Sequence, residues 1–414
     1  MLEVMLSILT IVVLKNWLLM MNSLVLWVLF LLFKIYDDGE YILSIILVLL
    51  SLWLTVMMLM SVNTQIKSVD LICVFTAVLF SLGVVFYCES MFFFYVGFEM
   101  SVIPILLIIF GWGYQPDRME AGLYMILYTV FFSLPLLVGV FYMEYFSLLD
   151  STLTYLMYMM AFFVKFPMVG LHLWLPRAHV EAPVFGSMIL AGVMLKLGGY
   201  GIIKISFIMG DMIFLYSFYI IVGSIVGGLI LSGVCFVQSD MKMLVAYSSV
   251  VHMSIVLAGL LTLRDSGLYG AIYMMVGHGF CSSGLFCILG LTYNRTLTRS
   301  LYLNKGIMSI LPSCSLWWFL FCSGNLSFPP SLNLPGEILL FISILSWQNS
   351  LYLLMAFFGT VSSMYSIYLF SFTQQGLSTN FFCFKCFSLK ESLVMFLHWV
   401  PLNLFIVDLS LMSF

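Results

Sequence analysis

The sequence predicts an all-α membrane protein with about 14 transmembrane helices. Of its 414 residues, 63% are apolar and only 8% are charged, whereas a soluble domain carries about 25% charged residues. Apolar runs of about 20 residues, the length that crosses a bilayer as a helix, follow one another along nearly the whole chain. Short polar breaks separate the runs, so we expect a whole protein in lipid and not a soluble domain with an anchor.

The polar breaks divide the chain into 14 apolar runs. The first run is too short to span a bilayer alone. Residues 1–36 therefore form either a hairpin or one long helix, and the total is 13 or 14 spans. The expected spans cover residues 2–14, 17–35, 41–60, 69–87, 91–110, 122–144, 153–171, 183–209, 213–237, 241–262, 267–291, 307–346, 351–372 and 391–411.

Basic residues are divided unevenly between the two ends of these helices. In the 14-helix arrangement one side receives ten lysines and arginines, and the other receives only Lys34, Lys204 and Arg264. Loops rich in lysine and arginine stay on the inner side of a membrane. We therefore expect both termini on the outer face, and Lys204 towards the outer end of its helix.

Prolines interrupt two of the runs. The run over 153–183 breaks after Lys165, and the run over 307–346 breaks at the stretch FPPSLNLPGE. Proline removes a backbone donor and clashes with the preceding turn, and non-helical backbone at membrane depth is tolerated only where protein or water lines it. One broken helix in each half of a chain is typical of transporters built from inverted repeats.

The breaks suggest how the chain is organised. We predict N-terminal transmembrane helices over 1–68, a first inverted repeat over 69–209 with its broken helix near 165–176, a second repeat over 213–372 with its broken helix near 325–337, and a C-terminal loop and helix over 373–414.

Titratable residues lie inside several apolar runs, where they are costly. A charged side chain at the bilayer centre costs about 2.5–3.5 kcal/mol on an insertion scale, so these residues must face one another or an internal path of water. Burial favours the neutral form of a lysine or a carboxyl, and a nearby opposite charge favours the charged form. Neutral histidine donates at one ring nitrogen and accepts at the other. The pattern indicates a proton relay through Glu99, Lys165, Lys196, His252, His278 and Glu337.

A structural interpretation stands beside the relay. Glu99 could be a structural partner for a lysine, Lys165 could bind carbonyls freed at the helix break, and His252 and His278 could be hydrogen-bonded core residues. Lys196 argues most strongly for a relay, because it lies mid-span among small residues that let helices approach closely, with no acidic residue near it in the sequence.

Other patterns indicate neither a metal nor a nucleotide site. The buried ligand-type residues do not recur three or four apart on one helix, as metal ligands do, and no phosphate-binding glycine motif occurs. The net charge of −3 gives no indication of nucleic-acid binding. A separate polar cluster follows the first helix break, which we interpret as a solvated inner loop that contacts a partner; its members are His172, Arg177, His179 and Glu181.

Four stretches resemble a known family. They are LHLWLPRAHVEAPVFGSMILAGVMLKLGGYG (171–201), QSDMKMLVAYSSVVHMS (238–254), GHGFCSSGLF (277–286) and GFEMSVIPILLIIFGWG (97–113). They resemble the antiporter-like chain 4 subunits of the proton-pumping NADH:ubiquinone oxidoreductase, respiratory complex I. The likeness covers residues from about 85 to 375 and is closer to chain 4 than to the related chains 2 and 5.

The resemblance implies an antiporter-like fold of 14 helices with two inverted repeats. The family's residues carry over by motif: Glu99 and Lys165 would be its glutamate–lysine pair, Lys196 its central lysine, His252 and His278 its connecting histidines, and Glu337 its terminal acidic site. Two positions depart from the family pattern. Arg177 stands where lysine is frequent, and Pro335 precedes Gly336 and Glu337 where a less rigid residue is expected.

The same resemblance implies a setting. The chain would lie in the mitochondrial inner membrane beside neighbouring antiporter-like subunits and lipid. It would hold no cofactor, since NADH, FMN, iron–sulfur clusters and ubiquinone are handled by other subunits of the complex. A cation/proton antiporter subunit, which resembles the same family, is the alternative function. A purely structural membrane scaffold is the third, and the buried ionisable residues argue against it.

Overall fold

The computed structural model describes residues 16–35, 42–63, 66–142, 152–377 and 386–409. Within these ranges the regular structure is helical, with one isolated bridge between Asp240 and Ser300. Ten helical segments in the described part of the chain are long and apolar enough to cross a membrane, and α9 (Thr152–Lys165) and α17 (Asn333–Trp347) are shorter apolar helices. The all-α membrane prediction is confirmed. The expected first span, 2–14, lies outside the described residues.

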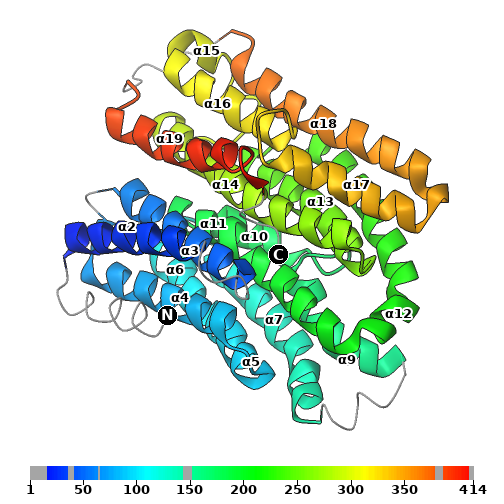
Figure 1. Cartoon of the computed structure of the whole chain (residues 1–414). Helices are drawn as coiled ribbons and strands as arrows, with labels where there is room; N and C mark the ends of the chain where they lie inside the picture. The colour runs from blue at the N-terminus through cyan, green and yellow to red at the C-terminus, as the bar shows by residue number, and fades with distance from the viewer. Residues whose placement is uncertain (1–15, 36–41, 64–65, 143–151, 378–385, 410–414) are drawn as a thin grey trace. The chain divides into compact units, whose positions relative to one another are not determined.

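The chain forms two compact units, shown within Figure 1. Unit 1 consists of the described residues within 1–166 and 181–213, together with Leu409. Within it α3 packs between α2 and α4, and α7 packs on α5, α6 and α9. Its helices are α2 (Trp17–Lys34), α3 (Ile42–Ser61), α4 (Val69–Tyr87), α5 (Met91–Met100), α6 (Val102–Trp112), α7 (Arg118–Phe141), α9, α11 (Val184–Ile189) and the first part of α12 (Leu195–Val237).

Unit 2 consists of residues 167–180 and 214–408. Its centre is α14, which packs against α13, α16, α17 and α19 (Figure 1). The middle of α14 is buried almost without interruption. The helices are α10 (Trp174–Glu181, which ends at the unit boundary), the second part of α12, α13 (Met241–Leu261), α14 (Asp265–Thr296), α15 (Ile307–Ile310), α16 (Pro312–Asn325), α17, α18 (Tyr352–Gln374) and α19 (Leu389–Leu404).

Helix α12 runs from one unit into the other. Its 43 residues would measure about 65 Å at 1.5 Å per residue, roughly twice the hydrocarbon thickness of a bilayer. Met209 interrupts the helix with non-helical backbone angles, φ −127° and ψ 36°. Two separate apolar spans, Val184–Gly210 and Met212–Val237, result, as the sequence predicts.

Both interrupted helices have the expected breaks. Helix α9 ends at Lys165 and α10 begins at Trp174, while α16 ends at Asn325 and α17 begins at Asn333. Pro335 is the third residue of α17. The first four N–H groups of a helix have no intrahelical acceptor, so the missing N–H of Pro335 removes no hydrogen bond there. This departure from the family pattern therefore leaves the helix intact.

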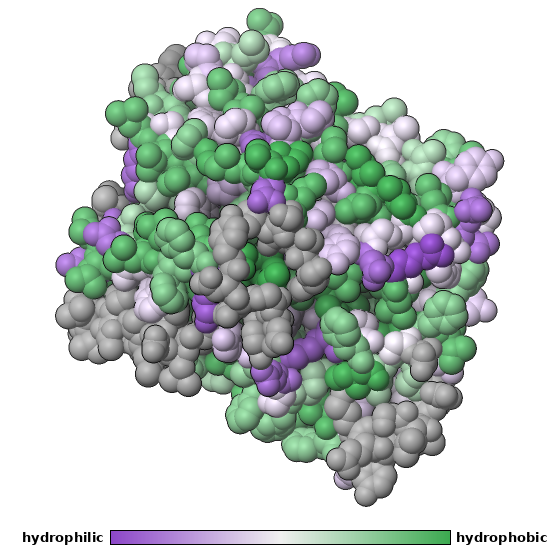
Figure 2. Space-filling view, in the orientation of Figure 1, coloured by the Kyte–Doolittle hydropathy of each residue, from purple (hydrophilic) through white to green (hydrophobic). Residues whose placement is uncertain are grey.

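Large apolar side chains remain exposed on many helices, as membrane spans require. Phe207, Phe214 and Tyr219 of α12 are examples, at 79%, 64% and 82% exposed. Figure 2 shows hydrophobic residues over most of the face in view, with hydrophilic residues in scattered patches. Such a surface suits lipid or neighbouring membrane subunits.

Candidate functional site: buried ionisable residues

In unit 1, Lys165 is held at a weak point of the glutamate helix. Pro104 cannot bond back to Met100 and clashes with its carbonyl, which separates α5 from α6. The carbonyl oxygen of Phe98, two residues before Met100, accepts from Ser101 Oγ at 2.7 Å and from Lys165 Nζ at 3.4 Å. The Lys165 ammonium also lies 4.4 Å from the centre of the Phe98 ring. The lysine is 2% exposed, so its charge is stabilised by a carbonyl and an aromatic face.

Glu99 lies beside Lys165 without direct contact. Each acts on the other electrostatically, yet no N···O distance within 4.0 Å joins them in the part of the chain that the structure describes. The Ser133 hydroxyl is close to the Glu99 carboxylate and to the Tyr95 hydroxyl. Glu99 Oε1 is buried without a hydrogen-bond partner among the described residues. A carboxylate oxygen of this kind is suited to accept a proton or a water.

Lys196 lies at a widened turn of its own helix. Residues Leu190–Met194 form a π turn between α11 and α12. Such turns loosen the regular backbone pattern and recur at functional sites. Lys196 Nζ donates to the carbonyl oxygen of Ala191 at 2.5 Å, and the side chain is fully buried. The turn therefore supplies a backbone acceptor for a lysine buried in the middle of a span.

Glycines bring α12 against the end of α9, close to both lysines. A Cβ on Gly198 would lie 2.7 Å from the backbone nitrogen of Phe166, and a Cβ on Gly201 would lie 2.0 Å from the Phe162 ring. Real side chains do not approach so closely, so only glycine permits this crossing. Phe166 follows Lys165 directly, and Gly198 lies two residues from Lys196. The structure thus places both lysines at one crossing of helices.

In unit 2, the two predicted histidines come together. The rings of His252 in α13 and His278 in α14 lie 5.7 Å apart between centres, and both residues are buried. The hydroxyl of Tyr365 in α18 and Nε2 of His252 are 3.0 Å apart and hydrogen-bonded. A neutral imidazole with a hydroxyl neighbour can pass a proton through its two nitrogens.

Glu337 belongs to the same polar group of unit 2. It acts electrostatically on Tyr365 and lies beside the hydroxyl of Ser327, in the break between α16 and α17. Asn325 ends α16 and interacts with both His252 and Tyr365. Thus α13, α14, α16, α17 and α18 each contribute a polar side chain, as a relay through unit 2 requires.

Sequence reasoning missed two residues of this polar group and one further buried histidine of unit 2. Tyr365 and Asn325 complete the group around His252. His398 of α19 is fully buried, its Nδ1 hydrogen-bonded to the carbonyl of Val394 at 2.8 Å. A polar side chain in the middle of an apolar run is the signal that could have found all three. Each of these side chains is neutral or can be neutral, so burying it in lipid costs less free energy than burying a fixed charge. For the same reason it is a weaker signal in the sequence.

Comparisons with known proteins agree with this fold. The family described as NADH:quinone oxidoreductase/Mrp antiporter, TM, matches residues 88–364, about two-thirds of the chain. The chain belongs to this family. Its relatives include proteins named NADH-ubiquinone oxidoreductase chain 4. That of Ceratitis capitata is 45% identical over 90% of this chain and 87% of its own length, and that of Aedes aegypti is 48% identical over 76% and 73%.

Solved structures show the same fold. A chain of respiratory complex I from Thermus thermophilus with bound NADH superposes with a TM-score of 0.86 at 20% identity, over 99% of this chain and 100% of that one. A chain of the Mrp complex from a Dietzia species gives 0.76 at 18% identity, over 88% of this chain and 42% of that one. The antiporter-like fold expected from the sequence is confirmed.

The cluster after the first break differs from its prediction as a solvated loop. His172, His179 and Glu181 are buried, and only Arg177 is exposed. His179 stacks on Phe286 with ring centres 4.5 Å apart and planes 3° apart. Within unit 2, the end of α10 is held by Lys242 and Arg299, which both donate to the carbonyl oxygen of Val180, at 3.2 and 3.1 Å. The prolines made this segment look like a loop, whereas Arg177, His179 and Glu181 lie in a short packed helix and only His172 precedes it.

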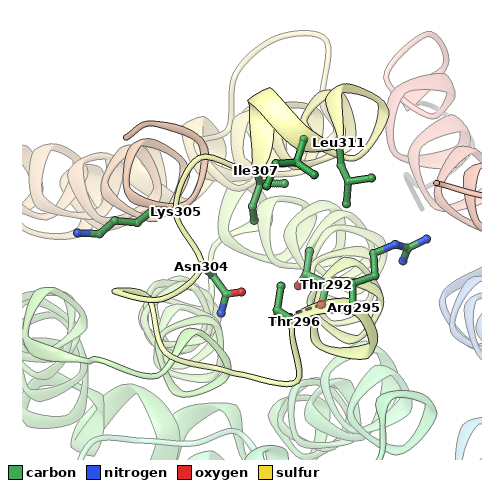
Figure 3. Close-up of a pocket in the computed structure, with 8 residues that line it drawn as sticks. Thr292, Arg295, Thr296, Asn304, Lys305, Ile307 and Leu311 are labelled. Atoms are coloured by element: carbon green, nitrogen blue, oxygen red, sulfur yellow. Dashed lines mark hydrogen bonds between the residues drawn. The ribbon is translucent and has the colours of Figure 1, made fainter. Parts of the chain in front are cut away.

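A small pocket in unit 2 lies at the end of α14 (Figure 3). It is lined by Thr292, Arg295, Thr296, Asn304, Lys305, Ile307, Ile310 and Leu311. The basic groups of Arg295 and Lys305 extend away from each other (Figure 3). Arg295 is engaged elsewhere, with Glu391, so the pocket offers no cluster of positive charge to a ligand.

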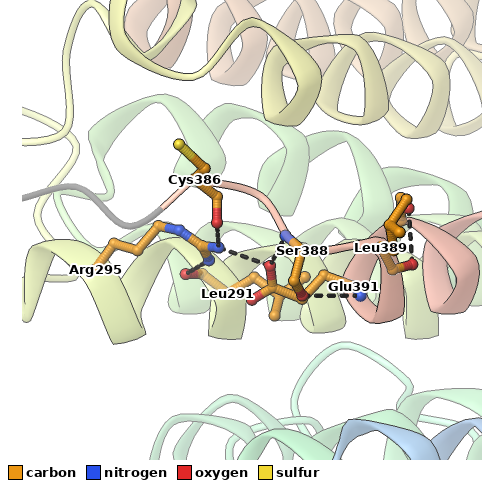
Figure 4. Close-up of polar contacts among 7 residues, drawn as sticks. Leu291, Arg295, Cys386, Ser388, Leu389 and Glu391 are labelled. Atoms are coloured by element: carbon orange, nitrogen blue, oxygen red, sulfur yellow. Dashed lines mark hydrogen bonds and ion pairs between the residues drawn. The ribbon is translucent and has the colours of Figure 1, made fainter.

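The Arg295–Glu391 pair anchors α19 to α14 (Figure 4). Arg295 Nη2 lies 2.7 Å from Glu391 Oε2. Ser388 and Glu391 form a capping box, with each side chain bonded to the other's backbone N–H, which satisfies two orphan donors of the helix. Burial alone would raise the pKa of the Glu391 carboxyl, but hydrogen bonds from Arg295 and Ser388, together with the Arg295 charge, bring that pKa below its ordinary value.

Proposed function

We propose that this chain is a proton-translocating membrane-arm subunit of a mitochondrial NADH:ubiquinone oxidoreductase and carries no redox centre. One observation carries the proposal. Two groups of ionisable side chains, one around Lys165 and Lys196 and one around His252 and His278, are buried in the apolar helices of a chain that belongs to this family. Burying such groups is costly, and a purely structural protein has no need of them. The relatives named NADH-ubiquinone oxidoreductase chain 4 favour this assignment over the other proteins of the same family.

In unit 1, lysine and glutamate would hold and release protons. Lys165 and Glu99 interact through space without a fixed ion pair. When the Glu99 carboxylate takes up a proton, Lys165 loses the opposite charge that favours its ammonium form. Lys165 can then release its proton to water, and the nitrogen keeps its lone pair. Lys196, buried at the same crossing, would be the next site to hold a proton.

In unit 2, side chains would transfer protons without keeping a charge. His252 can accept a proton at one ring nitrogen while it releases another from the second. Tyr365 holds Nε2 of His252 in place, and His278 packs beside it. Glu337 supplies a carboxylate at the second helix break. We propose that these residues carry protons through unit 2.

The same proposal assigns the setting of the protein. Neighbouring antiporter-like subunits and lipid of the mitochondrial inner membrane would cover its exposed apolar surface. NADH, FMN, iron–sulfur clusters and ubiquinone would be bound by other subunits. Among the described residues no cluster of three His, Cys, Asp or Glu side chains could hold a metal ion.

The first test is to separate the native membrane complexes by size. Membranes are solubilised in mild detergent, separated by size without denaturation, and assayed for NADH oxidation. We expect this chain to migrate with NADH oxidation in a very large particle. Migration in a small particle without NADH oxidation, together with sodium-dependent pH change in vesicles, would favour the cation/proton antiporter, whose fold the chain also shares.

The relay is tested by Lys196→Met in the assembled complex. We expect NADH-driven proton pumping to be lost or sharply reduced, because the buried site can no longer hold a proton. The matched control is Lys390→Met, which removes an exposed lysine in the first turn of α19 and should leave pumping unchanged. Normal pumping by an assembled Lys196→Met complex would contradict the relay.

A further inference from the structure

Five aromatic side chains of unit 1 pack into one cluster, which we call the aromatic plug. Neighbouring ring centres lie 5.4–6.1 Å apart, within the range of favourable aromatic contact. The rings come from α4, α5, α9 and α12, and all are buried. The plug consists of Phe86, Phe94, Phe98, Phe162 and Tyr200.

A lysine lies against each end of the plug. Lys165 Nζ is 4.4 Å from the centre of the Phe98 ring. Lys204 Nζ is 5.2 Å from the centre of Phe94 and 5.9 Å from that of Tyr200. Lys196, Tyr200 and Lys204 are spaced four residues apart and so share one face of α12. The plug therefore separates the buried relay lysines from Lys204.

Lys204 is fixed in place and faces the outer side. Its ammonium donates to the carbonyl oxygen of Cys88, just after α4 ends. Positive-inside counting puts both Lys204 and the 88–90 connection at the outer face, and the contact between them agrees with that orientation. Glu89, next in the chain, is exposed and acts on Lys204 electrostatically. The outer end of unit 1 thus carries an anchored cation.

The interior of the plug provides no route for a proton. Its single hydroxyl, on Tyr200, donates to the carbonyl oxygen of Phe86 at 3.0 Å. The remaining rings are hydrocarbon, and hydrocarbon constrictions exclude water. A proton crosses such a region only along hydrogen-bonded groups or water.

We propose that the aromatic plug and Lys204 seal the outer end of unit 1 against protons. The plug excludes water, and the anchored ammonium of Lys204 repels a hydronium ion that approaches from outside, as fixed positive charges do in other selective pores. A proton placed on Lys165 or Lys196 is thereby kept from leaving directly, and outer protons are kept from reaching them. This inference rests on the proposed proton function of unit 1.

Passive proton conductance tests the seal. The purified complex is placed in liposomes with a pH-sensitive dye inside, and a potassium diffusion potential drives protons inward with no NADH present. Lys204→Met should raise the passive proton flux several-fold and lower the number of protons pumped per NADH, while NADH oxidation continues. Lys204→Arg keeps the charge and the carbonyl contact, so its passive proton flux should equal that of the parent complex.

Other outcomes overturn the proposal. If Lys204→Met stays tight and pumps normally, Lys204 serves only to cap α4. If it stays tight and pumping stops, the outer end of unit 1 is an outlet and not a seal. Phe94→Leu, which keeps an apolar side chain but removes a ring, is the second variant should Lys204→Met not assemble. The Phe94→Leu complex should also show a raised passive proton flux, and an unchanged flux would contradict the seal. Because the leak is measured without NADH, it is independent of the Lys196→Met pumping result.

Discussion

The two units bury polar groups in different ways. In unit 1, Lys165 and Lys196 each donate to a backbone carbonyl at an irregular point of a helix. In unit 2, His252 bonds to a side chain, Tyr365, between regular helices. A buried ammonium is stabilised by the dipole of a carbonyl, whose oxygen has two lone pairs to offer. Neutral groups can satisfy one another, so His252 is bonded to a side chain and needs no carbonyl.

This difference suggests a division of labour. The surroundings of unit 1 suit groups that hold a proton as a charge until a partner changes. The surroundings of unit 2 suit groups that exchange protons without a lasting charge. Substitutions that remove a charge should therefore harm unit 1 most, and substitutions that keep hydrogen bonding should be tolerated best in unit 2.

Removing the charge at Lys165 should have the largest effect. We expect Lys165→Met to abolish most NADH-driven pumping, because the Phe98 carbonyl loses its cation and Glu99 its partner. Lys165→Arg, which keeps the charge, should retain a measurable share. Pumping is measured as proton uptake per NADH in liposomes. In unit 2, His252→Gln keeps a hydrogen-bond donor and an acceptor, so the complex that carries it should pump more protons per NADH than the Lys165→Met complex. The reverse order would contradict the proposed difference between the two units.

The next largest effect should come from replacing glycines in the two parts of α12, which pack differently against their neighbours. In unit 1, a Cβ on Gly201 would lie 2.0 Å from Phe162, so Gly201→Ala should destabilise the protein by about 1–3 kcal/mol, as overpacking does. In unit 2, a Cβ on Gly233 meets nothing within 4 Å. There Gly233→Ala should stabilise the helix by up to about 1 kcal/mol. Thermal inactivation of the solubilised complex measures both, and equal effects would contradict the crossing.

A single hydrogen bond in unit 2 should matter less. Tyr365→Phe removes the hydroxyl that contacts His252 Nε2 and leaves the ring in place. A net contribution of about 1 kcal/mol per hydrogen bond corresponds to about a fivefold slower proton transfer. The pumping rate should fall by about that factor, with assembly unchanged. An unaffected rate would show that the hydroxyl only fills space.

The smallest effect concerns the ion pair that anchors α19. The lowered pKa of Glu391 means that its folded form holds the proton less tightly than an unfolded carboxyl. Its stabilisation is therefore present at neutral pH and is lost as pH falls through the folded-state pKa. Glu391→Gln should cost about 1 kcal/mol at neutral pH, the upper end of the range for exposed pairs, because this pair is partly buried, and little in acid. Thermal inactivation across pH tests this, and a cost that persists in acid would contradict it.

Much of the fold is readable from the sequence. Long apolar runs and prolines fix where spans and breaks occur, because the bilayer penalises any other arrangement. The six relay candidates were found because charge at membrane depth is conspicuous. The assignment of repeats and the role of each candidate remain predictions.

The structure adds what one sequence does not show. The pairing of Tyr365 with His252 depends on how α18 packs against α13, and apolar runs do not specify which faces meet. The buried state of His179 depends on its stacking with Phe286, far away in the chain. The acceptors of Lys165 and Lys196 are backbone atoms, which carry no signal in residue identity.

The π turn before Lys196 has a consequence for how this gene can change. Deleting one residue from 190–194 would close the wide turn to an ordinary α-helical turn, and the helix beyond it would keep its buried face, because a π turn accommodates one extra residue within a single turn. A deletion in a regular part of the same helix would instead rotate everything beyond it by about 100° around the axis. One-residue deletions should therefore disturb the direction of Lys196 less at 190–194 than at neighbouring positions, and their main effect should be on the Ala191 carbonyl that this lysine contacts.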